Sequence, residues 1–309
     1  MRGVAIHCSG LVKRYGDVVA VDGLDLEVRR GECFGLLGPN GAGKTTTVEI
    51  FEGLLSPDAC EVKILGEYWR GDGRALRNRL GVQLQETRLH EKLTVLETIT
   101  LFRSFYSHGP RPEDVLRSVG LEEKSRAWVR TLSGGQQQRL SVACALACDP
   151  EILFLDEPTT GLDPQSRRQI WNIVTELRAR ERTVLLTTHY MDEAERLCDR
   201  VAIVDKGKII ALGSPAELIA SLGADNVVEI TCDRRPDLSA VAGLGDVQDM
   251  DGETARLRVS VKKLHRAVPE ILATLKAQQV ELLNLATHHA TLEDLFVALT
   301  GRELKDDRE

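Results

Sequence analysis

The sequence has no long apolar run and no excess of positive charge. No stretch approaches the roughly 20 consecutive apolar residues that a membrane-spanning helix needs, and the opening stretch, MRGVAIHCSG, has no apolar core of the length that a secretory signal requires. The formal net charge is -7, which argues against a general nucleic-acid-coating role, because such proteins usually present a basic face. We therefore expect a cytoplasmic chain with no nucleic-acid partner, which reaches a membrane only through another protein.

Cysteine is present, but not in a pattern that binds metal. There are seven cysteines, an odd number, and no two of them form a C-x-x-C pair. Cys144 and Cys148 lie in an alanine-rich helical stretch with no pair of histidines nearby. This distribution is typical of small core residues in a reducing compartment and argues against a zinc site.

The chain of 309 residues is expected to form about two domains, at roughly 150 residues each. Gly213 and Gly223 bracket a short predicted helix, and we place the domain boundary after it. This gives a first domain over residues 1–222 and a second, smaller domain over 223–301. Residues 302–309 are almost all charged and are expected to form a frayed tail.

Segments of continuous apolar character alternate with helical segments in the first domain. Predicted strands cover residues 32–37, 152–155, 183–187 and 200–205. Apolar strands that alternate with helices favour a mostly parallel sheet with helices on both faces. The first domain is therefore predicted to be an α/β domain.

The second domain has the pattern of a small α+β domain. We predict strands over residues 227–231, 255–260 and 280–286, a helix over 262–278, and a last helix from Thr291 to Gly301. In the second strand, Leu257 and Val259 alternate with Arg256 and Arg258, which is the signature of a half-buried strand. This pattern implies that the two arginines lie on the exposed face.

The strongest local signal is a glycine-rich segment that follows a predicted strand and precedes a helical pattern. It fits the phosphate-binding pattern G-x-x-x-x-G-K-[ST] and consists of Gly38, Pro39, Asn40, Gly41, Ala42, Gly43, Lys44 and Thr45. The glycines let the backbone approach phosphates closely, and the loop N–H groups and the helix N-terminus supply positive partial charge. Lys44 is expected to reach the β- and γ-phosphates of a nucleotide and Thr45 to ligate Mg²⁺, with Thr46 in the same site.

Two carboxylates follow the apolar strand at 152–155. Open α/β sheets bind ligands at the carboxyl ends of their strands, so Asp156 and Glu157 are expected beside the phosphate loop. Asp156 is then placed to hold Mg²⁺ through water, and Glu157 to polarise the attacking water as a general base. A solvated acidic strand end is the alternative.

A second anion-binding sequence precedes another predicted helix. Ser133 is suited to cap that helix, and Gly134 and Gly135, followed by Gln136, leave backbone N–H groups exposed at its positive end. One nucleotide does not need two such sites in one chain. Two chains that face each other would use both, one from each side.

The order and spacing of these elements resemble those of the ABC ATPase family over roughly residues 4–220. The phosphate loop resembles the Walker A motif, Asp156 and Glu157 resemble the Walker B pair, and residues 132–136 match the LSGGQ signature without alteration. The resemblance implies a P-loop NTPase fold with a mostly parallel core sheet and a helical signature subdomain. It also implies ATP and Mg²⁺ as ligands, ATP hydrolysis as the activity and a homodimer of the ATPase.

Four weaker elements are carried by the same resemblance. Gln85 resembles the Q-loop glutamine, which contacts Mg²⁺ and the membrane partner, and Asp163 lies in a segment that resembles the D-loop. His189 resembles the switch histidine that assists hydrolysis, and Tyr15 resembles the aromatic residue that stacks on adenine. Tyr15, Gln85 and His189 would each alone fit a plain structural role, and their position relative to the stronger motifs favours the functional one.

A narrower resemblance is to multidrug exporter ATPases of the daunorubicin-resistance type. It rests on the sequences VQLQET at 82–87, TTGLD at 159–163 and TLEDLF at 291–296. In that group the ATPase is a separate chain with a small C-terminal regulatory or dimerising domain, so the resemblance implies this role for residues 223–301. The ATPase works with a separate transmembrane permease subunit, which implies a peripheral position on the inner face of the cell membrane. The resemblance also implies efflux of a drug or another amphipathic, lipid-like solute.

Two alternatives belong to other functional classes. One is an ABC ATPase that moves no solute and regulates a cytoplasmic or nucleic-acid process. Lys44 and Ser133 are only 89 positions apart (133 minus 44), too few for the long coiled coil of chromosome-organising relatives. The other is an ATP-gated regulator without turnover, against which the intact Glu157 and Ser133 argue.

Overall fold

The computed structural model describes residues 3–70, 73–85, 88–237, 245–250 and 255–301. The chain divides into two compact units, Met1–Leu212 and Gly213–Glu309. The division precedes the helix that the sequence placed in the first domain, because this helix, α8 (Pro215–Ser221), packs against α10 (Leu292–Thr300) in the second unit. The predicted charged tail lies outside the described residues, as do Glu86 and Thr87.

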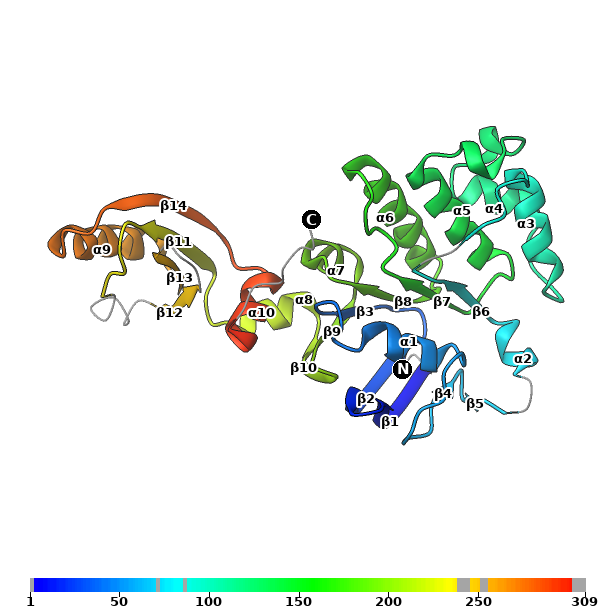
Figure 1. Ribbon diagram of the computed structural model, residues 1–309, viewed down its shortest axis with the longest axis horizontal. Helices are drawn as coiled ribbons and strands as arrows, with labels where there is room; N and C mark the ends of the chain where they lie inside the picture. Colours follow the sequence, from blue (N-terminus) through cyan, green and yellow to red (C-terminus); the bar gives the residue numbers. More distant parts are fainter. Residues whose placement is uncertain (1–2, 71–72, 86–87, 238–244, 251–254, 302–309) are drawn as a thin grey trace. The chain divides into compact units, whose positions relative to one another are not determined.

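A six-stranded sheet forms the centre of the first unit, with strand order β10-β9-β3-β8-β7-β6 (Figure 1). Its strands are β3 (Cys33–Leu37), β6 (Leu80–Gln83), β7 (Ile152–Asp156), β8 (Thr183–Thr188), β9 (Arg200–Asp205) and β10 (Lys208–Gly213). The pairings β9–β3, β3–β8, β8–β7 and β7–β6 are parallel. All residues of β3, β7 and β8 are buried, which explains their continuous apolar sequences and confirms the predicted α/β sheet.

A second sheet of the first unit has the order β2-β1-β4-β5. It contains β1 (Val4–Tyr15), β2 (Val18–Arg29), β4 (Lys63–Ile64) and β5 (Glu67–Tyr68). The sequence analysis predicted none of these strands. Strands β1 and β2 form an antiparallel hairpin whose buried residues join the same core as Phe34, Phe51 and Phe154.

Some helices of the first unit cover the central sheet, and others form a separate group beside it. The first unit contains α1 (Lys44–Phe51), α2 (Arg74–Arg77), α3 (Val95–Ser104), α4 (Pro112–Ser118), α5 (Gly134–Leu146), α6 (Pro164–Ala179) and α7 (Met191–Leu197). Two short 3-10 segments, Glu122–Lys124 and Val129–Thr131, lie between α4 and α5. Helices α3, α4 and α5 pack on one another, as the green and cyan group in Figure 1 shows, and this group is the predicted helical subdomain.

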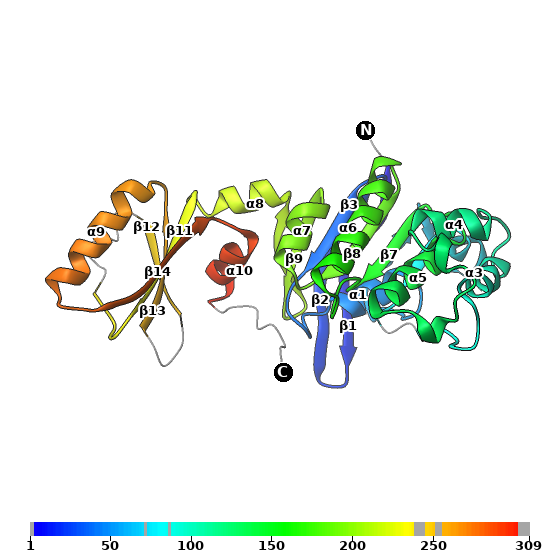
Figure 2. The ribbon, with the colours of Figure 1, turned by 90° about the horizontal axis from the view of Figure 1, so that it is seen from above.

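The second unit is built on an antiparallel sheet with the order β12-β13-β11-β14. Its strands are β11 (Asn226–Cys232), β12 (Gly245–Met250), β13 (Ala255–Val261) and β14 (Leu282–His289). Helix α9 (Leu264–Ala277) covers one face of this sheet, with Ile271 and Leu275 packed in the core (Figure 2). Helix α10 ends at Gly301, whose positive φ of 70° closes the helix as the sequence predicts.

One expectation about the second unit is wrong. Arg258 does not lie on an exposed face; only 6% of it is accessible. Its guanidinium pairs with Glu229, at 2.5 Å between Nη2 and Oε1, and lies 3.4 Å from Asp294 of α10. The alternating pattern identified the strand, but it could not show that the first turn of α10 reaches the opposite face of the sheet and buries the arginine there.

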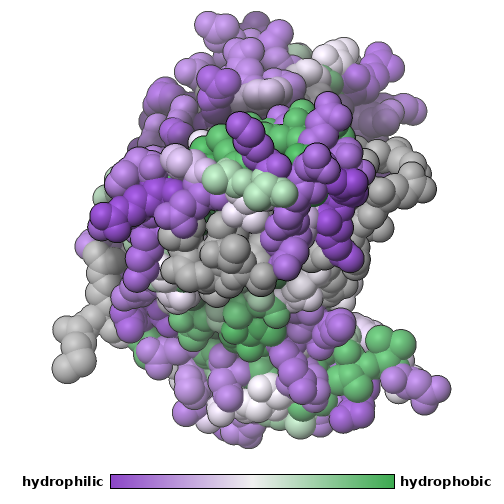
Figure 3. All heavy atoms as spheres, turned by 90° about the vertical axis from the view of Figure 1, so that its left-hand side faces the viewer, coloured by the Kyte–Doolittle hydropathy of each residue, from purple (hydrophilic) through white to green (hydrophobic). Residues whose placement is uncertain are grey.

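The surface of the chain is mostly polar on the face drawn in Figure 3, with separate apolar patches. The exposed large apolar residues of the second unit include Leu272, Leu283 and Leu299. Within the described residues, no helix combines the length and the apolar character that crossing a bilayer requires. All seven cysteines are free thiols, and six of them are buried.

Candidate active site

The phosphate loop lies between β3 and α1, so the strand–loop–helix context that the sequence predicts is present. Gly43 has a φ of 100°, and a Cβ atom there would lie 2.3 Å from the carbonyl oxygen of Ala20. Both observations require glycine at this position. Lys44 is 4% exposed, and its Nζ donates hydrogen bonds to the carbonyl oxygens of Gly38, at 2.7 Å, and Pro39, at 3.1 Å.

Asp156 is the last residue of β7 and lies beside the start of α1. Its Oδ1 accepts hydrogen bonds from the hydroxyl of Thr45, at 3.4 Å, and from the hydroxyl of Thr187 on the neighbouring strand. Burial raises the pKa of Asp156, while the two threonine hydroxyls act in the opposite direction. The carboxyl group therefore lies where sequence reasoning placed it, next to the phosphate loop.

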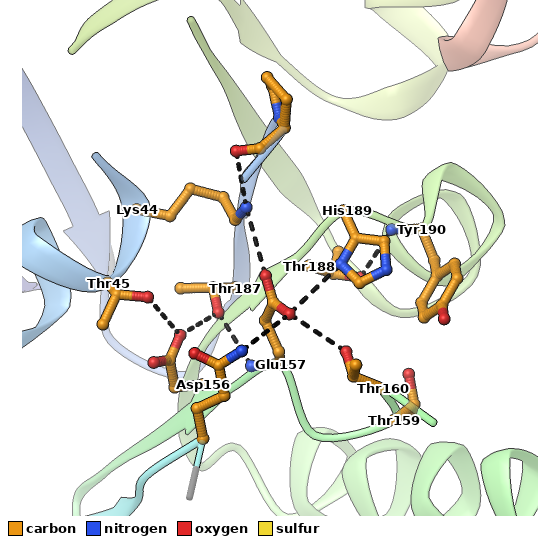
Figure 4. Close-up of polar contacts among 12 residues, drawn as sticks. Lys44, Thr45, Asp156, Glu157, Thr159, Thr160, Thr187, Thr188, His189 and Tyr190 are labelled. Atoms are coloured by element: carbon orange, nitrogen blue, oxygen red, sulfur yellow. Dashed lines mark hydrogen bonds and ion pairs between the residues drawn. The ribbon is translucent and has the colours of Figure 1, made fainter. Parts of the chain in front are cut away.

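Glu157 is the centre of the polar cluster in Figure 4. One carboxylate oxygen lies 3.3 Å from Nζ of Lys44, and the other lies 3.3 Å from Nδ1 of His189. Gln85 donates to the second oxygen at 3.4 Å, and the hydroxyl of Thr160 donates to it at 3.1 Å. The structure thus brings Lys44, Gln85, Glu157 and His189 together, although they lie on four separate segments of the chain.

The environment of Glu157 keeps its carboxyl group ionised. Burial alone would raise its pKa, but the contact with His189 and the charge of Lys44 outweigh burial and lower the pKa to about 2. The backbone of Glu157 has a positive φ of 46°, which is uncommon for a residue with a side chain. Such conformations persist where the surrounding contacts hold them, and they cluster at functional sites.

Two threonines of this cluster were missed by the sequence analysis. The Thr187 hydroxyl accepts a hydrogen bond from the Glu157 N–H at 2.9 Å and donates one to Asp156, so it fixes both acidic residues. Thr160 binds the Glu157 carboxylate directly. A signal was available for Thr187, because it occupies the carboxyl end of a predicted strand that is parallel to the Asp156 strand.

The signature segment and the D-loop segment lie next to each other, outside the Glu157 cluster. Ser133 caps α5 and forms a capping box with Gln136, and both Ser133 and Gly134 are exposed. A Cβ atom on Gly135 would lie 2.1 Å from the hydroxyl oxygen of Ser166. That hydroxyl donates to Asp163, the cap of α6, at 2.6 Å.

Tyr15 is placed apart from the acidic cluster, at the end of β1. Its ring is 49% exposed, and Nζ of Lys13 lies 5.7 Å from the ring centroid. An exposed aromatic face is available for stacking, as the sequence interpretation of Tyr15 requires. Nζ of Lys13 also pairs with Asp58, at 3.2 Å.

The residues beside the phosphate loop fit a magnesium ion. Thr45 and Asp156 present oxygen atoms 3.4 Å apart, and oxygen is the ligand that Mg²⁺ prefers. No group of three or more His, Cys, Asp or Glu side chains suited to a metal occurs among the described residues. Mg²⁺ does not need one, because it is usually held by one or two carboxylates together with substrate phosphates. Gln85, the third predicted ligand, contacts Glu157 instead of this pair.

A further carboxyl group, Glu52, is buried at the end of α1. It is 3% exposed, and burial together with the charges of Asp156 and Glu49 raises its pKa to about 8. The unfolded chain has a glutamate pKa near 4.3. The folded form therefore takes up a proton, and the stability linked to this proton is fully present below about pH 4.3 and is lost as the pH rises through about 8.

We expect Glu52→Gln to become more stable relative to the unaltered chain as the pH rises from about 5 to 8. The difference in free energy of unfolding should grow by at most about 1.4 kcal/mol per pH unit, because the amide has no proton to exchange. Urea unfolding at several pH values measures it, with Glu61→Gln as the control at an exposed carboxyl group. A difference that stays constant with pH would show that Glu52 is not held protonated.

The chain is similar to known proteins along the segments that form the site. The family model described as "ABC transporter" matches residues 21–160. The Nod factor export ATP-binding protein I of Ralstonia nicotianae is 44% identical and covers 97% of this chain and 95% of its own length. The linearmycin resistance ATP-binding protein LnrL of Bacillus subtilis is 36% identical, over 97% of this chain and all of its own length. The daunorubicin resistance ATP-binding protein DrrA3 of Streptomyces coeruleorubidus is 38% identical, over 100% and 98%.

Solved structures agree with these relatives for the first unit. A structure of the ATP-binding subunit of an ABC transporter has a TM-score of 0.64 and 28% identity, and the match covers 71% of this chain and 93% of that one. The dimeric structure of MJ0796, a bacterial ABC transporter cassette, has a TM-score of 0.62 and 28% identity, over 68% and 98%. CbiO1 of Clostridium perfringens, a part of the transporter complex cbiONQ, scores 0.64 at 28% identity, over 71% and 91%.

The sequence relatives and the solved structures indicate the same family. The phosphate loop, the acidic pair, the signature segment and His189 lie in a fold that this chain shares with solved ATP-binding cassettes. The sequence relatives are named as ATP-binding proteins, and the chain aligns with nearly all of their length. Subunits of this kind dimerise and take part in transporter complexes, as the dimeric cassette and the cbiONQ complex illustrate. The chain belongs to the ABC transporter family, and it is an ATP-binding subunit that hydrolyses ATP for transport.

Proposed function

We propose that this chain powers the export of a drug or another amphipathic, lipid-like solute through a separate membrane subunit, with two copies of the chain binding two ATP molecules between them. The observation that supports the chemical part is the convergence of Lys44 and His189 on Glu157, each at 3.3 Å. Residues from the phosphate loop and from the ends of two parallel strands thus surround one carboxylate. This is the arrangement that phosphate transfer to water needs.

The roles of the clustered residues follow from their charge and position. Glu157 is ionised at neutral pH and can orient and deprotonate the attacking water. Lys44 neutralises charge on the β- and γ-phosphates, and His189 holds the γ-phosphate side. Thr45 and Asp156, with Gln85 nearby, hold Mg²⁺, which supplies further neutralisation of phosphate charge when it is bound.

The exposed signature segment supports the dimeric part of the proposal. Ser133 and Gly134 face solvent at the N-terminus of α5, where backbone N–H groups and the helix dipole favour an anion. In the dimer, Ser133 to Gln136 of one copy contact the γ-phosphate held by Lys44 and Thr45 of the other. Contacts that ATP makes and ADP cannot make would drive closure, because a ligand shifts an equilibrium only by its differential affinity. Asp163, which shares Ser166 with the signature helix, lies beside the same interface.

The solute class and the direction of transport rest on the relatives. Their names concern export of Nod factor and resistance to linearmycin and daunorubicin, and their similarity extends through the second unit of this chain. A permease would bring the chain to the inner face of the membrane. Helix α3 offers a docking surface, because Leu101 and Phe105 are 43% and 67% exposed there and Phe102 packs against Phe105.

We expect a membrane protein encoded beside this chain to stimulate its ATPase activity and to extrude an amphipathic solute after reconstitution in vesicles. Phe105→Ser should lose most of this stimulation and keep the activity of the isolated chain, because it removes an apolar contact surface far in sequence from the acidic cluster. Leu54→Ser is the control at another exposed apolar residue, which is 60% accessible. Stimulation by nucleic acid in place of the membrane protein would favour a regulatory ATPase and contradict export.

A further inference from the structure

Glu193 is a fully buried carboxyl group that none of the roles above uses. It lies on α7, four positions after His189, and its exposed fraction is 0%. One of its carboxyl oxygens accepts two hydrogen bonds, from the hydroxyl of Thr159 and from the indole N–H of Trp171, both at 2.9 Å. A buried carboxyl group destabilises the folded state relative to an apolar side chain of similar size, which points to a specific role for Glu193.

The two donors to Glu193 belong to different segments. Trp171 lies in the middle of α6, whereas Thr159 lies in the turn that connects the end of β7 to α6. This turn begins at Glu157, whose backbone has the positive φ of 46°. It also contains Thr160, which binds the Glu157 carboxylate (Figure 4). Fixing Thr159 therefore fixes the path of the backbone on which Glu157 is carried.

Helices α6 and α7 make further contacts besides the hydrogen bond between Trp171 and Glu193. The guanidinium of Arg167 on α6 lies 4.2 Å from the ring centroid of Tyr190, which immediately precedes α7. The guanidinium of Arg196 on α7 lies 5.1 Å from the centroid of Trp171. Helices α6 and α7 are thus joined by two cation–π contacts in addition to the hydrogen bond. The bond to Thr159, in contrast, connects α7 to the turn itself.

We propose that Glu193 is a positioning residue that holds the turn of Glu157 at a fixed distance from the segment of His189. Glu193 and His189 are carried by one short stretch, and Thr159 and Glu157 by another, so the hydrogen bond of 2.9 Å between Glu193 and Thr159 ties the two stretches together. It adds to the contact of Thr187 with the backbone N–H of Glu157, which fixes only the start of the turn. Small displacements of reacting groups cost rate steeply, by as much as about 100-fold per ångström. The inference rests on the proposed role of Glu157 as the group that activates water.

The test compares three single variants of the full-length chain. Thr159→Val removes the donor in the turn and keeps the shape of the side chain, Trp171→Phe removes the donor in α6, and Thr159→Ser keeps the hydroxyl. We expect Thr159→Val to lower kcat by about 10-fold or more with little change in the Kd for ATP. Trp171→Phe and Thr159→Ser should keep kcat within about twofold, since the link between Glu193 and the turn survives in both.

A second comparison shows whether the effect passes through Glu157. In a Glu157→Gln background, adding Thr159→Val should leave the residual rate unchanged within about twofold, because there is no longer a base to position. The proposal is overturned if Thr159→Val and Trp171→Phe lower kcat equally, or if Thr159→Val changes only the thermal midpoint. It is also overturned if Thr159→Val lowers the rate of the Glu157→Gln variant by the same factor as that of the unaltered chain. Near-normal turnover of Glu157→Gln alone would instead overturn the proposed role of Glu157.

Discussion

Glu157→Gln is expected to bind ATP as tightly as the unaltered chain and to hydrolyse it at least about 100-fold more slowly. The carboxylate is unprotonated at neutral pH, as a general base must be, since its pKa is held at about 2, whereas the amide has no basic oxygen. The replacement has nearly the same shape and keeps one oxygen, which can accept a hydrogen bond from Lys44 or from Thr160, since these two contact different oxygens of the carboxylate. The defect should therefore appear in kcat and not in the Kd for ATP.

The same variant should accumulate as an ATP-bound dimer. If closure is driven by the γ-phosphate and ended by hydrolysis, a chain that cannot hydrolyse stays closed. Size-exclusion chromatography with light scattering, run with ATP or with ADP, distinguishes the two forms. Glu176→Gln on α6 is the control, because its exposed carboxylate lies 4.0 Å from Arg180 and away from the cluster. Turnover near the normal rate would remove Glu157 from the role of general base.

Lys44→Ala should weaken ATP binding by about 10- to 100-fold, as expected for loss of a charge-assisted hydrogen bond to phosphate. The ammonium group of Lys44 is positioned by the carbonyl oxygens of Gly38 and Pro39, so it reaches the site already oriented. Its removal also leaves the buried carboxylate of Glu157 without its cationic neighbour at 3.3 Å, which disfavours a second anion in the same place.

Titration with a fluorescent ATP analogue or calorimetry measures the affinity of Lys44→Ala. Lys208→Ala is the matched control, because it also pairs with a carboxylate, Asp22 at 3.1 Å, but its side chain is 61% exposed. A surface pair of this kind contributes little. Unchanged affinity in Lys44→Ala would contradict the assignment of the phosphate loop.

The sequence predicted four of the parallel strands of the central sheet well, but it missed β6 and the outer hairpin. Strand β9 has the predicted bounds, and β3, β7 and β8 differ from prediction by one residue at an end, because strands covered on both faces are apolar throughout. Strand β1 escaped prediction because its burial does not alternate regularly and its pairing with β2 shifts register at four places. Strand β2 was missed although its second half alternates, with Leu24, Leu26 and Val28 buried between exposed residues.

The candidate site could also be predicted only in part. The phosphate loop and the acidic pair could be found because each is a short continuous pattern whose chemistry depends on neighbours in sequence. Thr187 and Glu193 act on residues that lie 31 and 34 positions away, so their contacts depend on strand register and helix packing. The position of Thr187 at the carboxyl end of a predicted strand indicated the correct edge of the sheet, but neither its partners nor those of Glu193 follow from sequence spacing.

The central claim is that one ATP is held by the phosphate loop of one copy and the signature segment of another. Mixing two inactive variants tests it most directly: Lys44→Ala retains an intact Ser133, and Ser133→Arg retains an intact Lys44. Mixed dimers contain one site in which both residues are intact, so ATPase activity should rise above that of either variant alone. Activity of the mixture equal to the average of the two separate variants would contradict a site shared between two chains.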